Sequence, residues 1–233
     1  MVASSPALSS SLSPADAAVA AVAGHAVWRG DARAAHADAS ATPTGFAELD
    51  AELPGGGWPA GGLVDLLQPA HAGAELRLLA PLLGATARAA LSPRPIVCIA
   101  PPAQPCAPAL AALGIALERL VWLTPTGTAD AAWCAEQALR SGACAAVLWW
   151  SGWLPGVVGR VGGAAISSNP ALWRRLHLAA QAGASPLFAL RPLALRAQAS
   201  PAPLRLALTP AGIDSVNLQV FKRRGPPMPQ PLR

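Results

Sequence analysis

The chain of 233 residues lacks any long unbroken apolar run. A helix that spans a bilayer needs about 20 consecutive apolar residues. The two most apolar stretches, LRLLAPLLGATARAAL and ACAAVLWW, are interrupted by arginine or proline, or are too short. The N-terminus also lacks the early basic residues and the compact apolar segment of a secretion signal. From these absences we expect a soluble, cytoplasmic protein with no membrane contact.

Cysteine and histidine are scarce, with four of each, and no two cysteines are spaced C-x-x-C. Zinc sites and secreted disulfide frameworks depend on denser or closely spaced cysteines. Cys98, Cys134 and Cys144 lie in runs typical of buried strand or helix, whereas Cys106 does not. We therefore expect thiols that pack in the core, and neither a metal site nor a disulfide framework.

Lysine is almost absent, because Lys222, close to the C-terminus, is the only one in the chain. A glycine-rich phosphate loop uses a lysine at the start of its helix to reach the β- and γ-phosphates of a nucleotide. No loop that precedes a helix in this sequence contains that lysine. The sequence therefore argues against ATP hydrolysis and against any other cofactor held in this way, and we expect no enzymatic activity.

Acidic residues are scarce in the last third of the chain. Residues 151–233 contain nine arginines, one lysine and one aspartate, whereas residues 1–150 contain seven arginines and eleven acidic residues. The two parts therefore have net charges of +9 and −4, which together give the overall +5. A basic C-terminal third favours a polyanionic or acidic partner. The alternative is an arginine-rich surface that only keeps the protein in solution.

The sequence predicts one domain between two irregular ends. Residues 1–43 are rich in alanine, serine and proline, which is typical of a flexible leader, and residues 225–233 form a proline-rich tail that we expect to be loose. In the domain, residues 44–224, strands and helices alternate. The predicted strands are 63–67, 95–100, 120–124, 145–150, 186–191, 203–210 and 216–224, and the predicted helices are 74–91, 108–114, 130–142 and 171–183.

The first strands are continuous apolar runs without alternation, which is typical of strands covered on both faces. Strands separated by helices indicate right-handed crossovers and a mostly parallel sheet. The last two strands are predicted to form an antiparallel extension. Pro81 lies inside a predicted helix and costs about 3 kcal/mol there, so we expect a kink or a later start. The fold class is therefore α/β, with helices that flank the sheet.

Two stretches contain motifs of a known type. TGFAELDAELPGGGWPAGGLVDLLQPAHAG, residues 44–73, resembles the opening of the RecA-type ATPase core, in which T-G-x-x-x-L-D and a glycine-rich turn precede a strand and a phosphate loop. ALRSGACAAVLWWSG, residues 138–152, resembles the RecA segment in which a helix ending R-S-G leads into a strand ending in Asp-Ser. The resemblance implies a RecA-like core.

From Thr44 to about Gly225 the chain resembles the ImuA family of RecA/SulA-like proteins still more closely, through IAPPAQPCAPAL, AAWCAEQALRSGAC, LWRRLHLAAQAG and FKRRG. The resemblance implies a non-catalytic accessory protein of damage-induced (SOS) translesion DNA synthesis. Its implied partners are an ImuB-type, Y-family-like polymerase protein and, through it, an error-prone replicative-type DNA polymerase and the sliding clamp. The alternative is a SulA-like, damage-induced inhibitor that binds the tubulin-like division protein.

The resemblance also identifies the positions at which a RecA-type protein holds ATP and Mg²⁺. The loop glycine is matched, but the lysine, the hydroxyl residue, the strand-end acid and the catalytic glutamate are all replaced. The residues at this degenerate site are Gln68, Pro69, Gly73, Ala74, Glu75, Pro102 and Trp150. Glu75 and His71, four residues apart, are expected to be a solvated pair in the loop.

Exposed arginine beside an aromatic ring is the chemistry of a groove for single-stranded nucleic acid. On this ground the candidate residues for DNA or partner contact are Trp153, Arg160, Arg174, Arg175, Lys222, Arg223 and Arg224. Trp149 and Trp150 are expected in the core. Trp173 is expected to project towards the edge of its helix, and His177 to lie at the surface or in a groove.

Overall fold

The computed structural model describes residues 41–69, 74–88, 94–152, 169–212, 215–225, 228 and 230–232. Helices and strands alternate along the chain, as the sequence predicts, and the termini of the predicted elements agree with the structure to within three residues. The order is α2 Ala47–Glu52, β1 Gly62–Gln68, α3 Ala74–Arg88, β2 Ile96–Ile99, α4 Ala107–Ala112, η1 Leu117–Arg119, β3 Leu120–Leu123, α5 Thr128–Arg140, β4 Ala146–Trp150, α7 Pro170–Ala182, β5 Pro186–Pro192, η2 Leu193–Ala197, β6 Leu204–Pro210 and β7 Val216–Lys222.

The described strands form a seven-stranded sheet in the order β3-β2-β4-β5-β1-β6-β7. All neighbours pair in parallel except β6 and β7, which are antiparallel. The antiparallel extension is therefore confirmed, and it is confined to β7, because β6 itself runs parallel to β1. Strand β1 lies between β5 and β6, with every one of its residues buried.

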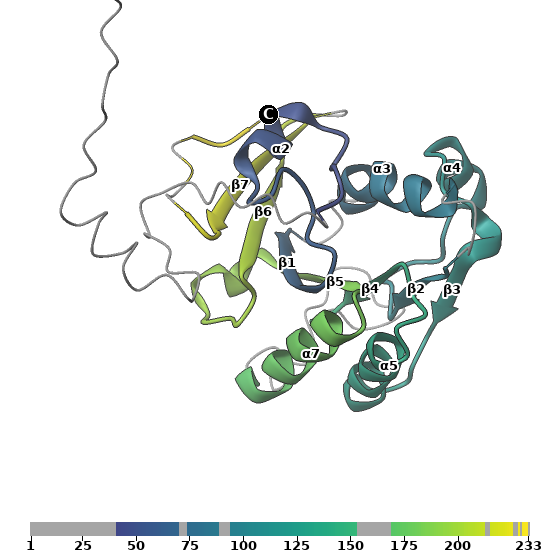
Figure 1. Cartoon of the computed structure of the whole chain (residues 1–233). Helices are drawn as coiled ribbons and strands as arrows, with labels where there is room; N and C mark the ends of the chain where they lie inside the picture. The colour runs from purple at the N-terminus through teal and green to yellow at the C-terminus, as the bar shows by residue number, and fades with distance from the viewer. Residues whose placement is uncertain are drawn as a thin grey trace, which may run out of the picture.

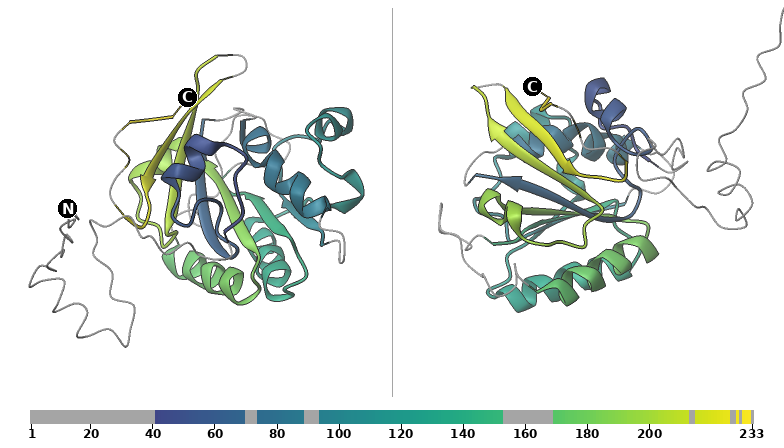
Figure 2. Two further views of the ribbon diagram at one scale, coloured as in Figure 1. Left: turned by 45° about the horizontal axis from the view of Figure 1, so that its top comes forward. Right: turned by 90° about the vertical axis from the view of Figure 1, so that its left-hand side faces the viewer.

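Helices cover both faces of the sheet (Figure 1). Helices α2, α3 and α4 pack on one face through leucines such as Leu49, Leu79 and Leu110. Helices α5 and α7 pack side by side on the other face, as the right-hand view of Figure 2 shows, through small residues and residues such as Leu139, Trp173 and Leu176. The mixed α/β class with a mostly parallel, helix-flanked sheet is thus confirmed.

Pro81 lies inside α3, and the helix begins at Ala74, so the expectation of a late start is wrong. The proline ring packs against the turn that carries the T-G motif. A Cβ atom added at Gly45 would lie 2.6 Å from the Cβ atom of Pro81, and Gly45 has a φ of +88°, which side chains disfavour. The glycine of the motif therefore permits both the turn and its close approach to α3.

The thiols behave as expected from the sequence. Cys98 and Cys144 are buried, Cys134 is half-buried and Cys106 is exposed. Burial raises the pKa of the Cys98 thiol to about 12, so it remains protonated and unreactive at neutral pH. Within the described ranges, no helix is both long enough and apolar enough to cross a membrane.

The C-terminal tail is not loose where the structure describes it. Met228 is buried in the core that α2 and α3 share with the sheet. Leu232 pairs with Leu218 of β7 through two backbone hydrogen bonds of 2.8 Å. The tail differs from the prediction because Met228 and Leu232 carry apolar side chains. A composition rich in proline does not prevent single apolar residues from packing against the domain. Residues 1–40, most of the predicted leader, lie outside the described part of the chain.

Candidate functional site

The position of a RecA-type nucleotide site falls where β1 and β4 end and α3 begins. Gln68 is the last residue of β1, Trp150 is the last of β4, and Glu75 is the second residue of α3. Strands β1, β5 and β4 are neighbours in the sheet and run parallel to one another. Their carboxyl ends therefore lie at the same edge of the sheet. The sheet order therefore places Gln68, Trp150 and Glu75 at the same end of the molecule.

Glu75 and Trp150 are bonded to each other. The indole Nε1 of Trp150 donates a buried hydrogen bond of 3.1 Å to Oε1 of Glu75. Glu75 is only 6% exposed, and its second oxygen, Oε2, has no hydrogen-bond partner. The expected solvated pair is therefore wrong, because the helix start turns Glu75 inward, towards the end of β4. The Trp150 ring also packs against Trp122, with a distance of 6.2 Å between ring centroids.

These residues do not fit a nucleotide and its Mg²⁺ ion. A helix N-terminus attracts phosphate because its free N–H groups and its dipole favour negative charge. In this chain the carboxylate of Glu75 already supplies a negative charge in the first turn of α3. Trp150, at the position where the RecA resemblance implies a strand-end acid, has no oxygen that could bind Mg²⁺. Glu75 and Trp150 thus occupy this position as a pair, because they are joined by a hydrogen bond.

The remaining residues of the degenerate site are less informative. Gln68 is buried, and its Oε1 has no hydrogen-bond partner. Pro69, Ala74 and Pro102 are half-buried, and Pro102 follows the end of β2. Gly73 and His71 lie outside the described residues. Among the residues that the structure describes, no group of histidine, cysteine, aspartate and glutamate has the arrangement of a metal site.

Helix α7 presents two of the predicted contact residues to solvent. Arg174 and Arg175 are both exposed, and Nη2 of Arg175 lies 2.9 Å from Oε2 of Glu136 on α5. The prediction for Trp173 is wrong, because this side chain is 2% exposed. Its ring packs against Trp149, with a distance of 5.1 Å between centroids. Trp149 and Trp150 are buried, as predicted.

The three basic residues at the end of β7, Lys222, Arg223 and Arg224, have different environments. Lys222 and Arg224 are exposed, and Nζ of Lys222 donates a 2.7 Å hydrogen bond to the Ser200 carbonyl. The Arg223 side chain is only 4% exposed, and its Nη1 lies 2.5 Å from Oε2 of Glu52. Arg223 thus ties β7 to α2 and does not face solvent. Trp153 and Arg160 lie outside the described residues.

His177 connects α7 to the start of β1. Its Nδ1 accepts a 3.0 Å hydrogen bond from the backbone N–H of Leu63. Gly62, with a φ of +107°, permits this approach, because an added Cβ would lie 3.1 Å from Cε1 of the ring. Burial lowers the pKa of His177, and the charges of Arg224 and Lys222 lower it further. The neutral ring that accepts this bond is therefore favoured, and His177 has a structural role.

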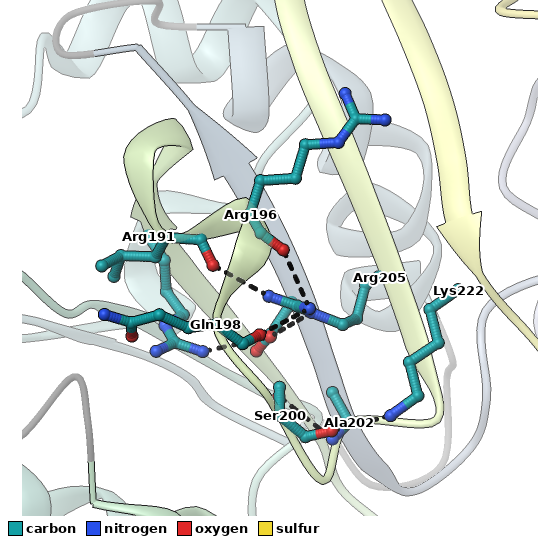
Figure 3. A network of polar contacts seen from close by, with 9 residues as sticks. Arg191, Arg196, Gln198, Ser200, Ala202, Arg205 and Lys222 are labelled. Atoms are coloured by element: carbon teal, nitrogen blue, oxygen red, sulfur yellow. Dashed lines mark hydrogen bonds and ion pairs between the residues drawn. The ribbon is translucent and has the colours of Figure 1, made fainter.

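A buried charged network includes Arg191 and Arg205, which Figure 3 shows among their polar contacts. Oδ2 of Asp65, on β1, lies 3.1 Å from Nη1 of Arg191 on β5 and 2.9 Å from Nε of Arg205 on β6. Asp65 and Arg191 are almost completely buried, and Arg205 is 5% exposed. One carboxylate therefore neutralises part of the charge of two guanidinium groups in the interior.

Arg205 also holds η2 in place. Its Nη1 and Nη2 atoms donate hydrogen bonds of 3.0 to 3.3 Å to the backbone oxygens of Leu195, Arg196 and Gln198. The guanidinium groups of Arg205 and Arg196 both lie over the Phe221 ring, 4.8 and 5.0 Å from its centroid. Arg191 lies 4.8 Å from the centroid of Trp173. The network thus joins β1, β5, β6, β7, α7 and η2.

Sequence reasoning did not identify this network. The one feature of the sequence that indicates the network is Asp65, the only charged residue in the apolar strand LVDLL. A charged side chain in a strand covered on both faces must be paired, because an isolated buried charge is very costly. The sequence alone could not identify Arg191 and Arg205 as the partners, since they lie 126 and 140 positions further along the chain.

No protein-family model matches this chain, and no curated protein matches it. Among solved structures, the chain is similar to the crystal structure of SulA from Pseudomonas aeruginosa, with 27% sequence identity. The match covers 55% of this chain and 97% of that chain, with a TM-score of 0.40. A likeness at this TM-score carries no argument about the function of this chain.

Proposed function

We propose that this chain is a non-catalytic accessory protein of damage-induced translesion DNA synthesis. In this role a RecA-like body acts as an adaptor for an ImuB-type, Y-family-like polymerase protein. That partner links the chain to an error-prone replicative-type DNA polymerase and to the sliding clamp. The basic surface of the chain contacts DNA. The ImuA-like motifs between Thr44 and Gly225 supply the choice of pathway and partner.

The observation that carries the proposal is the buried bond between Glu75 and Trp150. It joins the residues at two chemical positions of a nucleotide site, in a chain whose only lysine lies beyond that site, at Lys222. Phosphoryl transfer depends on positioned cations and Mg²⁺. A fold that retains the strand and the helix on either side of the loop but replaces these groups is suited to binding a partner.

The DNA contact is assigned to four exposed basic residues, Arg174, Arg175, Lys222 and Arg224. His177 is influenced by the charges of both Lys222 and Arg224, so the end of β7 lies near α7. Basic side chains that neutralise phosphates release counterions, which makes binding strong at low salt and weak at high salt. Arg223 is left out of this surface because its side chain is buried against Glu52.

Affinity capture with the tagged chain from cells with damaged DNA tests the proposal. We expect a Y-family-like polymerase protein in the captured fraction, and we expect it to remain after nuclease treatment because the contact is between proteins. A matched variant with Arg174, Arg175, Lys222 and Arg224 changed to Ala should still capture this partner. Recovery of the tubulin-like division protein in its place would instead support a SulA-like inhibitor of division.

A further inference from the structure

One exposed tryptophan has no role in the core or in the function proposed above. Trp133, on α5, is 62% exposed. The other tryptophans that the structure describes are buried or half-buried, namely Trp58, Trp122, Trp149, Trp150 and Trp173. Full burial of a large aromatic side chain is strongly stabilising. Because the Trp133 side chain is exposed, it does not contribute this stabilisation. Its position therefore indicates a role in binding and not in folding.

The helical periodicity of α5 directs Trp133 to solvent. The side of α5 that packs on the sheet consists of small or aliphatic residues, including Ala131, Ala135 and Leu139. Trp133, Gln137 and Arg140 are all exposed and recur at helical spacing, so they form one solvent-facing stripe. The ring and the guanidinium group thus belong to the same surface of the helix.

Glu136 places a second arginine beside this stripe. Its Oε2 lies 2.9 Å from Nη2 of Arg175 on α7, and its Oε1 lies 3.5 Å from Nη1 of Arg140. Both arginine side chains remain more than 60% exposed, whereas the carboxylate is almost buried. Glu136 is three residues from Trp133, which places it one helical turn away. The pairing therefore holds the two arginines beside Glu136, one helical turn from Trp133, and leaves most of each arginine accessible.

The charge of this outer face favours an anionic ligand. Helices α5 and α7 expose Arg140, Arg174 and Arg175, against one exposed acid, Asp130, and the nearly buried Glu136. Exposed arginines on the same face as an exposed aromatic ring match a single strand of nucleic acid, whose phosphates need cations and whose unpaired bases need a flat surface for stacking. A duplex has no free base to stack on the ring.

We propose that Trp133 stacks on a base of single-stranded nucleic acid whose phosphates lie against Arg140, Arg174 and Arg175. The inference rests on the proposed function, because it assigns the DNA contact of the adaptor to the outer face of α5 and α7. The inference adds Trp133, which lies outside the basic clusters. It also specifies that the ligand is single-stranded and not duplex nucleic acid. The gap opposite a damaged template presents such unpaired bases to a translesion complex.

The test is binding of a fluorescently labelled oligothymidylate to the full chain, measured by anisotropy at low and moderate salt. Trp133→Ala is expected to weaken binding about five- to hundred-fold, because stacking on one base contributes that much. Trp133→Phe, which keeps a ring, should restore most of the affinity. Leu178→Ala, which removes another exposed apolar side chain of these helices, should leave it unchanged.

Two further measurements separate stacking from charge. Trp133→Ala should leave the slope of log K against log salt unchanged, whereas Arg174→Ala should reduce it by about 0.7 for one phosphate contact. Binding to a duplex of equal length should not respond to Trp133→Ala. Because Trp133 is exposed, the melting temperature of the variant should match that of the unchanged protein.

The inference is overturned if the unchanged protein does not bind the oligonucleotide, or if Trp133→Ala binds it equally well. An equal loss for single strands and duplex would also overturn it. These outcomes are distinct from failure of the adaptor role. Trp133→Ala should still capture the polymerase-like partner, and loss of that partner from the unchanged protein would reject the adaptor without reference to Trp133.

Discussion

Replacing Asp65 with Asn is expected to lower the free energy of unfolding by about 3–5 kcal/mol, the cost of removing one partner from a buried ion pair. The substitution retains the shape of the side chain and removes its charge. Arg191 and Arg205 would then lose the carboxylate that pairs with both of them in the interior.

Chemical denaturation with urea, followed by circular dichroism, measures this loss as a decrease in the midpoint. Glu118→Gln is the matched control, since it makes the same change of charge on an exposed side chain next to β3. It should alter the free energy of unfolding by no more than about 0.5 kcal/mol. If Asp65→Asn behaved like Glu118→Gln, the network would not stabilise the fold as described.

Replacing Trp150 with Ala is expected to cost about 3–5 kcal/mol, because it removes a large buried ring. The ring packs against Trp122, and among the residues that the structure describes its Nε1 supplies the one hydrogen bond to the Glu75 carboxylate. Trp150→Phe separates these two contributions. It keeps an aromatic ring but leaves both oxygens of Glu75 buried without a donor, which costs about 1–3 kcal/mol.

Urea denaturation of both variants should give a larger loss for Trp150→Ala than for Trp150→Phe. Adding Glu75→Leu, which removes the acceptor oxygen, to Trp150→Phe should then cost less than the sum of the two single changes, since the same hydrogen bond is lost in each. Trp133→Ala is the control for removing an exposed indole. Full additivity of the two changes would mean that Glu75 and Trp150 do not depend on each other.

The architecture could be predicted from the sequence because the strands are buried on both faces. The apolar runs AAVLWW and PLFALR became β4 and β5, which lie next to each other in the centre of the sheet. A strand of this kind has no polar side to expose, so its apolar run is continuous and its limits are clear. Breaks at glycine and proline then separate strand from helix.

The contacts of individual side chains were harder to predict because they join distant parts of the chain. Glu75 was expected in solvent, yet its partner Trp150 is brought to it only by the neighbouring ends of β1, β5 and β4. Trp173 lies beside two exposed arginines in the sequence, yet it packs against Trp149. Asp65 gave a local signal of burial, but its partners depend on the order of the strands.

We propose that this chain uses a RecA-like fold without a working nucleotide site as a binding body. Thermal unfolding with and without ATP and Mg²⁺ tests it most directly, at a salt concentration that screens the basic surface. Binding at 100 times the dissociation constant would add about 2.7 kcal/mol, which corresponds to roughly 5–10 °C for a domain of this size. We predict no change in the melting temperature. A saturable increase with ATP that persists in high salt and is absent with inorganic triphosphate would contradict the account.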